Sequence, residues 1–305
     1  MANEFLQYSS LIESFGCEVR ADEPMKNHTT FKIGGCADLF ITVNNKEQLD
    51  MVVDLCNEKG IPVFVLGNGS NLLVSDKGIR GAVLRLGGEF CEVGFNDDST
   101  LHCGAGAQLS KLCAFALEHS LTGLEFAWGI PGSCGGAAFM DAGAYGGEMK
   151  NVVVSCEHVE LATGKWGSFE GGELDFAYRH SAYSDGGYVI TALNLKLEKG
   201  DKEEIKAKMD ELMERRRDKQ PLEYPSAGSV FKRPVGYFAG GLIEQCGLKG
   251  TQVGGAQVSP KHAGFIVNAG GATCGDVLEL IARIQETVKN ETGIELECEV
   301  RKTGE

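Results

Sequence analysis

The sequence predicts an α/β protein of two or more domains, and three observations lead to this prediction. The chain has 305 residues, which is long enough for two or more domains with substantial cores. Segments whose apolar residues recur with the helical period occur together with short runs rich in β-branched residues. A highly charged predicted helix at 200–219 marks a change of composition, so we place a domain boundary at this helix.

The composition is that of a soluble globular protein with an excess of glycine. Hydrophobic residues make up 43% and charged residues 24% of the chain, which is ordinary. The 42 glycines are roughly twice the usual share of about 7%, and they gather in loops without a period, which indicates turns that approach a ligand. The net charge of −14 disfavours nucleic acid and anionic membranes as partners, so an anionic substrate needs a local cluster of Arg and Lys.

The 11 cysteines indicate reduced core residues and neither disulfides nor a metal site. No two are spaced as CxxC, and no His flanks them with zinc-ligand spacing. Most fall on apolar faces, such as Cys56, Cys113, Cys246 and Cys298, where a thiol behaves as a small hydrophobe. No apolar run reaches membrane-spanning length, and the N-terminus lacks a signal-peptide pattern. We therefore expect a cytoplasmic protein without membrane insertion and without a bound metal.

The stretch 62–74 predicts a buried strand, a turn of small residues and a second buried strand. The turn reads Gly67-Asn68-Gly69-Ser70-Asn71. Glycine allows positive φ and the close approach of another molecule, and successive amides in such a turn suit a phosphate. The dinucleotide pattern GxGxxG is not present, because a leucine occupies the third glycine position. An ordinary tight turn is the alternative interpretation.

The other elements of the N-terminal part follow from periodicity and end signals. A helix is expected up to Gly16, residues 17–27 are expected to be irregular, and a helix at 46–59 should end at Gly60. Further expected elements are strands at 39–43, 83–86, 152–161, 166–169 and 189–197, a hairpin at 90–103 turning at Asn96-Asp97-Asp98, and a helix at 108–119.

A second glycine-rich stretch covers residues 128–147. It has no regular period, yet it carries large apolar side chains that need burial, so we interpret it as a packed loop lining a ligand. The C-terminal part contains five further expected elements, which are a loop or edge strand at 226–234, a helix at 239–246, a strand within 262–268, a helix at 274–292 between Thr273 and Gly293, and a last strand at 294–301 that alternates apolar and charged residues.

A set of motifs, taken in order, resembles one family. The motifs are the two glycine-rich stretches, Tyr178-Arg179-His180-Ser181, Ala227-Gly228-Ser229 and the closing Glu299-Val300-Arg301. Over about residues 27–301 the chain resembles the UDP-N-acetylenolpyruvoylglucosamine reductases, flavin enzymes that make UDP-N-acetylmuramate for peptidoglycan. It resembles their shorter branch, because the interval between Arg179 and Ser229 is short and one predicted helix takes up much of it.

This resemblance implies a fold and a cofactor. Residues 30–197 would form an FAD-binding domain of the vanillyl-alcohol-oxidase type, after an N-terminal helix and lead-in at 1–29 and before a smaller α+β substrate-binding domain at 198–305. FAD would be bound non-covalently, with NADPH as co-substrate. The implied cofactor-binding residues are Gly67, Asn68, Gly69, Ser70 and Asn71 for the pyrophosphate, and Ile130, Pro131, Gly132, Gly135, Gly136 and Ala137 against pyrophosphate and flavin. Cys134 and Asp141 stand where the family commonly has a small apolar residue and Asn.

The resemblance assigns catalysis to Arg179, Ser229 and Glu299. An Arg fork can clamp a carboxylate and oppose enolate charge. Ser229 would donate the proton, and Glu299, if burial holds it protonated, would stabilise developing charge. Taken alone, the three residues also fit a surface Arg, a turn Ser and one of three glutamates on a polar strand face, the other two being Glu295 and Glu297.

The implied reaction has two halves. NADPH reduces FAD, and the reduced flavin passes hydride to the terminal methylene of the enolpyruvyl group. The substrate is a UDP-linked amino sugar with a carboxylate, so cations must gather around it. The candidates are Arg217, Lys232, Arg233, Lys261 and Arg301. We expect the enzyme to be a monomer.

Two other functions stay open on the residues alone. One is another FAD oxidase or dehydrogenase on the same fold, with flavin attached covalently at a His, and its flavin would survive denaturation. The other is a non-catalytic nucleotide-sugar sensor, which would bind UDP-sugar without oxidising NADPH. The three catalytic matches weigh against both.

Overall fold

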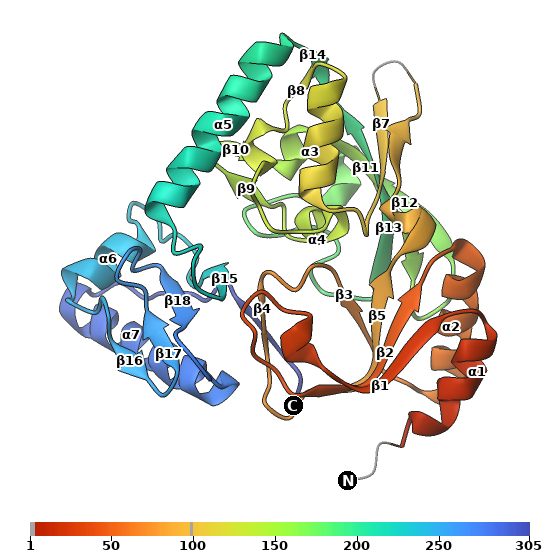
Figure 1. Ribbon diagram of the computed structural model, residues 1–305, viewed down its shortest axis with the longest axis horizontal. Coiled ribbons are helices and arrows are strands. Elements are labelled where there is room, and N and C mark those ends of the chain that lie inside the picture. The colour runs from red at the N-terminus through yellow and green to blue at the C-terminus, as the bar shows by residue number, and fades with distance from the viewer. Residues whose placement is uncertain (1–3, 98–99) are drawn as a thin grey trace. The chain divides into compact units, whose positions relative to one another are not determined.

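The computed structural model describes residues 4–97 and 100–305, and the chain divides into two compact units (Figure 1). The units are not consecutive stretches, since two short N-terminal segments belong with the C-terminal part. The first unit comprises Met1–Ala21, Leu39–Asn68 and Gly81–Arg215. The second unit comprises Asp22–Asp38, Gly69–Arg80 and Arg216–Glu305.

Pairing with the chain's end explains why the segment 69–80 belongs to the second unit. β4 (Leu72–Val74) runs parallel to β19 (Arg301–Thr303), with Leu72 opposite Arg301. Such a non-local pairing has no local sequence signal. The boundaries expected at residues 30 and 198 are therefore not those of the compact units, and they remain a hypothesis about functional domains.

The first unit contains two main sheets. The four-stranded sheet has the order β1-β2-β5-β3, and β3 runs parallel to β5. The five-stranded sheet has the order β12-β11-β13-β7-β6 and is antiparallel throughout. The strands are β1 (Glu18–Pro24), β2 (Cys36–Val43), β3 (Val63–Leu66), β5 (Ile79–Leu86), β6 (Val93–Phe95), β7 (Thr100–Gly104), β11 (Val153–Glu160), β12 (Trp166–Glu170) and β13 (Tyr188–Lys196).

The helix α2 agrees with its sequence signals. In α2 the Asn45 side chain caps the helix by accepting from the Gln48 amide, and Gly60 ends the helix in the left-handed region, as expected. The helices of this part are α1 (Ser9–Ser14), α2 (Lys46–Lys59), α3 (Leu109–Glu118), α4 (Cys134–Phe139) and α5 (Lys202–Lys219). Shorter elements of the first unit are η1 (Leu6–Tyr8), η3 (Gly88–Cys91), η4 (Glu125–Ala127), η5 (Met149–Asn151), η6 (Gly171–Leu174), β8 (Leu121–Thr122), β9 (Gly143–Ala144), β10 (Gly147–Glu148) and β14 (Glu198–Lys199), whereas η2 (Met25–Asn27) belongs to the second unit.

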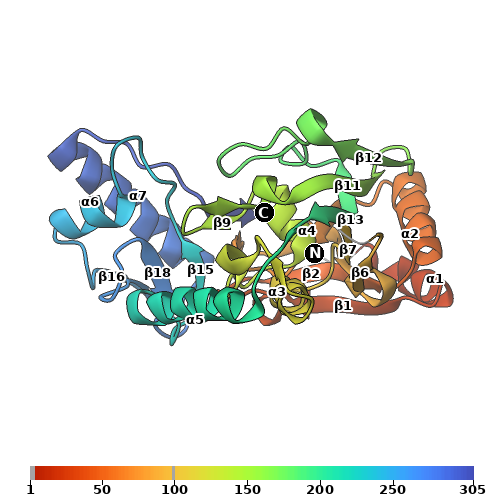
Figure 2. The same ribbon diagram turned by 90° about the horizontal axis from the view of Figure 1, so that it is seen from above.

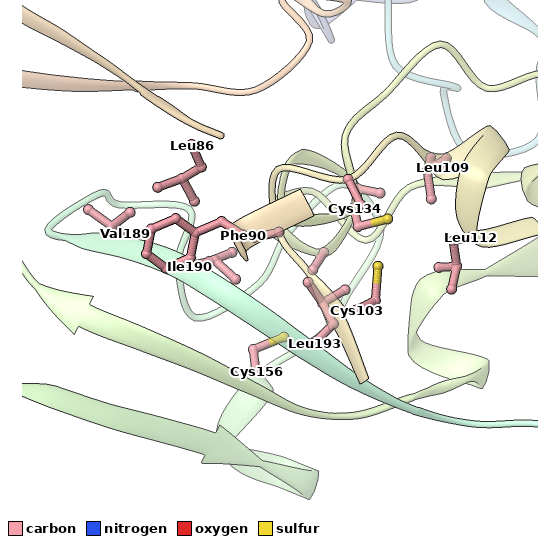
Figure 3. Close-up of a cluster of buried hydrophobic side chains, with 14 of the residues drawn as sticks. Leu86, Phe90, Cys103, Leu109, Leu112, Cys134, Cys156, Val189, Ile190 and Leu193 are labelled. Carbon is pink, nitrogen blue, oxygen red and sulfur yellow. The ribbon is translucent and has the colours of Figure 1, made fainter. Parts of the chain in front are cut away.

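Cysteines help to fill the core of the first unit. Figure 3 shows the sulfur atoms of Cys103 and Cys134 facing one another among leucine, valine and isoleucine side chains. All 11 cysteines are free thiols. Burial raises the pKa of Cys113 and of Cys156 to about 12, so these thiols stay protonated and behave as apolar groups. Seven of the 11 cysteines are buried, as predicted for most of them, whereas Cys36, Cys91, Cys246 and Cys298 are half-buried.

The second unit is an antiparallel sheet with two helices. The sheet has the order β15-β18-β17-β16, and Figure 2 shows α6 and α7 on one side of it. Its elements are β15 (Ser226–Ser229), α6 (Ala239–Gln245), β16 (Gln252–Val253), β17 (Ala256–Val258), β18 (Phe265–Asn268) and α7 (Cys274–Thr292). In α7 a capping box formed by Thr273 and Asp276 begins the helix and Gly293 ends it. The helix buries an apolar stripe of Val277, Leu280, Ile281, Ile284 and Val288.

Three local expectations are wrong. Residues 17–27 are not irregular, because they contain β1. The glycine-rich stretch 128–147 contains α4 and the hairpin of β9 and β10. The last strand begins only at Arg301, because residues 294–300 form just one isolated bridge although their burial still alternates. The expected hairpin of β6 and β7 is present, but Asp98 of its turn lies outside the described residues.

Candidate active site

The turn between β3 and β4 contains two glycines that are required for different reasons. Gly69 has φ +63°, and a Cβ there would lie 2.1 Å from the carbonyl oxygen of His28. The protein's own backbone therefore demands glycine at this position, whether or not a ligand binds. Gly67 has an ordinary φ, and its missing side chain makes room for the Ser133 hydroxyl, which would lie 2.4 Å from a Cβ.

The same turn offers donors that fit a phosphate. Among the described residues, the backbone amides of Gly69 and Ser70 donate to no acceptor. Gly69 is buried, and a buried polar group without a partner costs about 1–3 kcal/mol. Two consecutive amides of this kind form the concavity that binds anions in other proteins. The turn therefore fits the pyrophosphate of FAD.

Within the first unit, the beginning of this turn contacts the second glycine-rich stretch. The Asn68 side chain donates to the carbonyl oxygen of Pro131 at 2.8 Å. Ser133, which occupies the space beside Gly67, also caps α4 by accepting from the Gly136 amide at 3.2 Å. The structure thus brings together two segments that the sequence assigned to one cofactor.

The glycines of the second stretch differ in what surrounds them. A Cβ on Gly135 would lie 2.7 Å from the Cβ of Ala105, so packing explains this glycine without a cofactor. Gly136 is exposed, and a Cβ there would meet only the Ser133 hydroxyl, at 3.1 Å. A Cβ on Gly132 would touch only the Leu109 and Ile130 side chains, at 3.4 and 3.9 Å. Gly132 and Gly136 are therefore the positions where a flat ligand could approach the backbone.

The amides of this second stretch have partners already. Ile130 donates to Ala127, Gly132 donates to the Ile130 carbonyl, and Gly135 donates to Ala105, at 2.8–3.0 Å. Ala137 likewise donates to Ser133 at 2.9 Å. These residues could hold a flavin by surface contact, whereas phosphate donors come from the first turn.

Arg179 lies in a strained turn of the first unit. Its φ is +58°, a conformation that costs energy for a residue with a side chain and that clusters at functional sites. Ala177 and His180 exchange both of their backbone hydrogen bonds across this turn, at 2.9 and 3.1 Å. The guanidinium stacks on the Tyr178 ring at 4.9 Å and donates to the Gly143 carbonyl at 3.4 Å.

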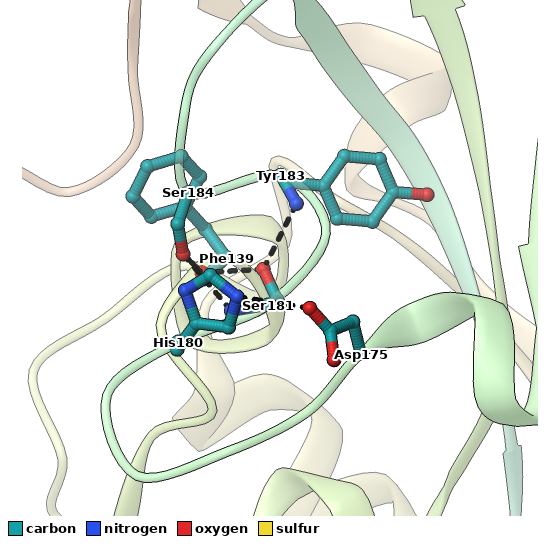
Figure 4. A network of polar contacts seen from close by, with 6 residues as sticks. All are labelled: Phe139, Asp175, His180, Ser181, Tyr183 and Ser184. Atoms are coloured by element: carbon teal, nitrogen blue, oxygen red, sulfur yellow. Dashed lines mark hydrogen bonds and ion pairs between the residues drawn. The ribbon is translucent and has the colours of Figure 1, made fainter.

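The residues after Arg179 fasten this turn to α4, and Figure 4 shows the contacts. The buried hydroxyl of Ser181 donates to the carbonyl oxygen of Phe139 at 2.6 Å and accepts from the Tyr183 amide at 3.3 Å. His180 pairs with Asp175 at 3.1 Å. The sequence pointed to the Tyr-Arg-His-Ser run but gave no sign that Ser181 is an anchor, because that role depends on α4.

Asp141 is a buried carboxylate with positive φ in the same unit. It is fully buried and has φ +41°, which Asp tolerates better than most residues. Its Oδ1 accepts from the Lys150 amide at 2.8 Å, while Oδ2 lies 3.8 Å from the Lys150 ammonium. No hydrogen-bond partner of Oδ2 occurs in the part of the chain that the structure describes. Burial raises the pKa of the Asp141 carboxyl, and the positive charges of Lys150 and Arg179 oppose this rise.

In the second unit, Ser229 ends β15 beside a backbone irregularity. β15 pairs with β18 through Ser226 and Ser229, but the register shifts between them, and Gly228 has φ +76°. A bulge of this kind re-aims the side chain that follows it. The next residue, Val230, accepts a backbone hydrogen bond from Glu299 at 2.7 Å, so two predicted catalytic residues lie in neighbouring segments.

The structure distinguishes Glu299 from Glu295 and Glu297, the two other glutamates of the same alternating pattern. Glu295 pairs with Lys289 and has a side chain 75% exposed. Glu297 pairs with Lys232 and has a side chain 73% exposed. Glu299 is half-buried, and its backbone is held on both sides. The sequence could not make this distinction, because all three glutamates share one period.

The candidate substrate cations of the second unit differ in their surroundings. Lys232 is paired with Glu297. The Lys261 ammonium donates to the carbonyl oxygen of Arg217 at 2.7 Å, and the Arg217 side chain is exposed. Arg301 is exposed at the start of β19, and Arg233 stacks on the Phe238 ring at 4.0 Å. Sequence reasoning missed Arg216, which is the buried member of the arginine run.

Known proteins are similar to this chain over nearly its full length. A model of the FAD binding domain matches residues 37–169, and a model of the UDP-N-acetylenolpyruvoylglucosamine reductase C-terminal domain matches residues 220–303. The chain is 46% identical over 299 residues to the UDP-N-acetylenolpyruvoylglucosamine reductase of Syntrophomonas wolfei, covering 98% of this chain and 99% of the relative. The same enzyme of Clostridium novyi is 49% identical over 288 residues, covering 94% and 93%.

A solved structure agrees with these matches. The crystal structure of UDP-N-acetylenolpyruvylglucosamine reductase from Thermus caldophilus has a TM-score of 0.81 and 38% identity, covering 94% of this chain and 99% of that one. The FAD-binding domain and the turn that fits its pyrophosphate define an FAD-dependent oxidoreductase. The chain belongs to the UDP-N-acetylenolpyruvoylglucosamine reductase family. The predicted family and the predicted fold class, α+β with an FAD-binding domain and a smaller C-terminal domain, are confirmed.

Two features are absent from the part of the chain that the structure describes. None of the helices there is both long enough and apolar enough to span a bilayer. No group of three or more His, Cys, Asp or Glu side chains in that part of the chain could hold a metal ion.

Proposed function

We propose that this protein reduces the enolpyruvyl ether of UDP-N-acetylglucosamine enolpyruvate to UDP-N-acetylmuramate, with NADPH as the reductant, in peptidoglycan precursor synthesis. The observation that carries this proposal is identity of 46% along nearly the full length of a UDP-N-acetylenolpyruvoylglucosamine reductase. The catalytic roles of Arg179, Ser229 and Glu299 are proposed on the same family resemblance.

The residues proposed to hold FAD fall into two groups. The amides of Gly69 and Ser70 would donate to the pyrophosphate, and Asn68 would fix the second glycine-rich stretch through Pro131. Gly132 and Gly136 would let the cofactor approach the backbone. When bound, FAD supplies the hydride that NADPH delivers to it and that the substrate receives.

Arg179 is proposed to bind the carboxylate of the enolpyruvyl group. A guanidinium can form two parallel hydrogen bonds to a carboxylate, and it opposes the charge that accumulates there as hydride arrives at the adjacent methylene. The strained backbone and the Ser181 anchor hold the turn that carries Arg179, and the contacts with Tyr178 and Gly143 orient the guanidinium before substrate binds. Preorganisation of this kind lowers the cost of reorganisation during reaction.

Ser229 is proposed to protonate the carbon that bears the carboxylate, and Glu299 to stabilise the same charge. The register shift in β15 lies immediately before Ser229, and Glu299 is half-buried on the neighbouring segment, which supports these roles. Lys232, Lys261, Arg217 and Arg301 remain proposals for the UDP moiety, and the ion pair of Lys232 with Glu297 must open for this role.

The finer details of the proposal follow from the same family. We infer a cytoplasmic monomer with functional domains at 30–197 and 198–305, and the absence of disulfides supports a reducing compartment. The shorter branch is supported by the short interval between Arg179 and Ser229, most of which β13, β14 and α5 occupy.

The visible spectrum of the purified protein tests the reaction. We expect a flavin spectrum that NADPH bleaches and that UDP-N-acetylglucosamine enolpyruvate restores without oxygen. Trichloroacetic acid should release the flavin, since the attachment is non-covalent. A protein that binds UDP-sugars without bleaching by NADPH would contradict the proposal, and so would one that is reoxidised only by oxygen.

A further inference from the structure

Asn71 lies at the end of the cofactor turn, but its side-chain amide and its backbone carbonyl oxygen form hydrogen bonds with the C-terminal segment. Its side-chain amide donates to the carbonyl oxygen of Glu299 at 3.1 Å. Its own carbonyl oxygen accepts from the Arg301 amide at 3.0 Å. Asn71 therefore contacts the residue that carries the proposed catalytic carboxyl and also the residue two positions later.

The backbone of Glu299 is fixed on both sides as a result. Its amide donates to Val230 at 2.7 Å, next to Ser229, and its carbonyl oxygen accepts from Asn71. When the peptide groups before and after a residue are both held, the direction of its Cα–Cβ bond is set. The position of the Glu299 carboxyl then depends on the torsion angles of its side chain.

The neighbouring ladder strengthens this constraint. Leu72 pairs with Arg301 in the parallel ladder of β4 and β19, so the turn leads directly into the strand that continues from Glu299. Gly69 and Ser70, whose amides fit the pyrophosphate, immediately precede Asn71. The cofactor turn and the catalytic segment are thus two parts of one hydrogen-bonded arrangement.

We propose that Asn71 is a positioning residue, which holds Glu299 through its carbonyl oxygen and ties the cofactor turn to the catalytic segment. This inference rests on the proposed role of Glu299. The family resemblance assigned Asn71 to the cofactor, whereas the structure directs its side-chain donor to Glu299.

Asn71→Asp is the sharpest variant, because it keeps the shape and replaces the donor with an acceptor. A carboxylate facing the Glu299 carbonyl cannot donate, but a protonated carboxyl can. We expect FAD to be retained, and flavin reoxidation by the substrate to slow by about 10- to 100-fold at neutral pH, the scale of a small misplacement of a catalytic group. The loss should shrink as the pH falls and the new carboxyl regains its proton.

Two further variants separate this effect from simple destabilisation. Asn71→Ala should slow reoxidation without the recovery at low pH, because alanine has no proton to regain. Asn268→Asp is the matched control, since its side-chain amide also donates to a backbone carbonyl in the second unit, that of Phe31, at 3.2 Å. This control should leave the reoxidation rate and its pH profile unchanged.

A readout on the protein without FAD tests the contact itself. Amide hydrogen exchange of the peptide covering residues 296–303 should speed up in Asn71→Asp and should stay at the parent rate in Asn268→Asp. The charged groups beside Asn71 on this segment are Glu299 and Arg301. Exchange at the parent rate in Asn71→Asp would overturn the positioning role.

Combination with Glu299→Gln distinguishes the inference from the proposed function. If Asn71 acts through Glu299, adding Asn71→Asp to Glu299→Gln should slow reoxidation little further. Effects that multiply would overturn the inference alone, and so would complete loss of FAD in both Asn71 variants. If Glu299→Gln is reoxidised at the parent rate, the proposed role of Glu299 fails and the inference about Asn71 fails with it.

Discussion

The backbone amide of Glu299 donates to the carbonyl oxygen of Val230 at 2.7 Å, which places the last predicted catalytic residue beside the residue that follows Ser229. Phe231 and Cys298 continue the same antiparallel contact as an isolated bridge. Two motifs that lie far apart in the sequence are therefore neighbours in the second unit. A proton donor and a charge-stabilising carboxyl on adjacent segments can act on the same carbon.

Ser229→Ala should affect only one half of the reaction. No proton is needed at the substrate carbon before charge develops there, so the variant should bind FAD and be reduced by NADPH at a near-normal rate. Reoxidation by the enolpyruvyl substrate should slow by about 100-fold or more, as expected when a positioned general acid is lost. Ser229→Cys, which keeps a donor, should fall between the two. Stopped-flow absorbance of the flavin measures each half.

The opposite pattern would contradict the proton-donor role. If Ser229→Ala loses reduction by NADPH while reoxidation by the substrate survives, Ser229 is a residue that binds nicotinamide.

Gly136→Val should reduce FAD binding without unfolding the protein. The position is exposed, and a Cβ there meets only the Ser133 hydroxyl, so the added bulk would project towards the proposed cofactor. Gly94→Val in β6 is the control, because a Cβ there has no neighbour within 4 Å and valine suits a strand. Flavin content after gel filtration and circular dichroism measure the two properties. Normal flavin content in Gly136→Val would contradict the proposed cofactor contact.

Gly69 is a poorer position for this test. A side chain there would clash with the His28 backbone, so loss of flavin would follow from misfolding as readily as from a blocked pyrophosphate site. Gly69 variants should therefore lose flavin together with stability.

Ser181→Ala should loosen the turn that carries Arg179. The variant loses the 2.6 Å hydrogen bond to Phe139 and the one from Tyr183, and we expect the free energy of unfolding to fall by about 1–2 kcal/mol. Reoxidation by the substrate should slow by about 10-fold or more, because Arg179 is no longer held for the carboxylate. Urea denaturation and stopped flow measure the two effects.

Ser184→Ala provides the comparison. Its hydroxyl accepts from the Ser181 amide at 2.9 Å, but it lies 3.4 Å from the Phe139 carbonyl, and Ser184 is less buried than Ser181, so we expect a smaller loss of stability than in Ser181→Ala. Equal effects of the two variants on reoxidation would argue against a specific role for Ser181.

Asp141→Asn should change how stability depends on pH. Burial raises the pKa of the Asp141 carboxyl in the folded state, so the protonated form is favoured there. Stability from this group is fully present below the unfolded-state pKa and is lost as the pH rises through the folded-state pKa. The amide cannot ionise, so its advantage over the parent should grow with pH and reach about 1–3 kcal/mol, the cost of an unsatisfied buried group.

Urea denaturation at several pH values checks this expectation. Asp54→Asn, a change at an exposed aspartate of α2, is the control. A stability difference for Asp141→Asn that shrinks as the pH rises would mean that the ion pair with Lys150 outweighs the cost of burial.

The sequence by itself determined the elements whose signals are local. The bounds of α2 and α7 follow from the helical period together with Thr273 and the closing glycines. The motifs also identified the family and the candidate residues. Period and end signals lie within a few residues of one another, so no long-range contact is needed to interpret them.

Tertiary structure decided the features that depend on distant partners. Glu299 is half-buried, whereas the side chains of Glu295 and Glu297 are exposed and paired with lysines, and this difference depends on the segments packed around them. In the same way, Gly135 is explained by Ala105 and the role of Ser181 by α4. Such contacts join segments that lie far apart in the sequence. They produce no local pattern in the sequence, because the burial and hydrogen bonding of a residue depend on its distant partner as much as on the residue itself.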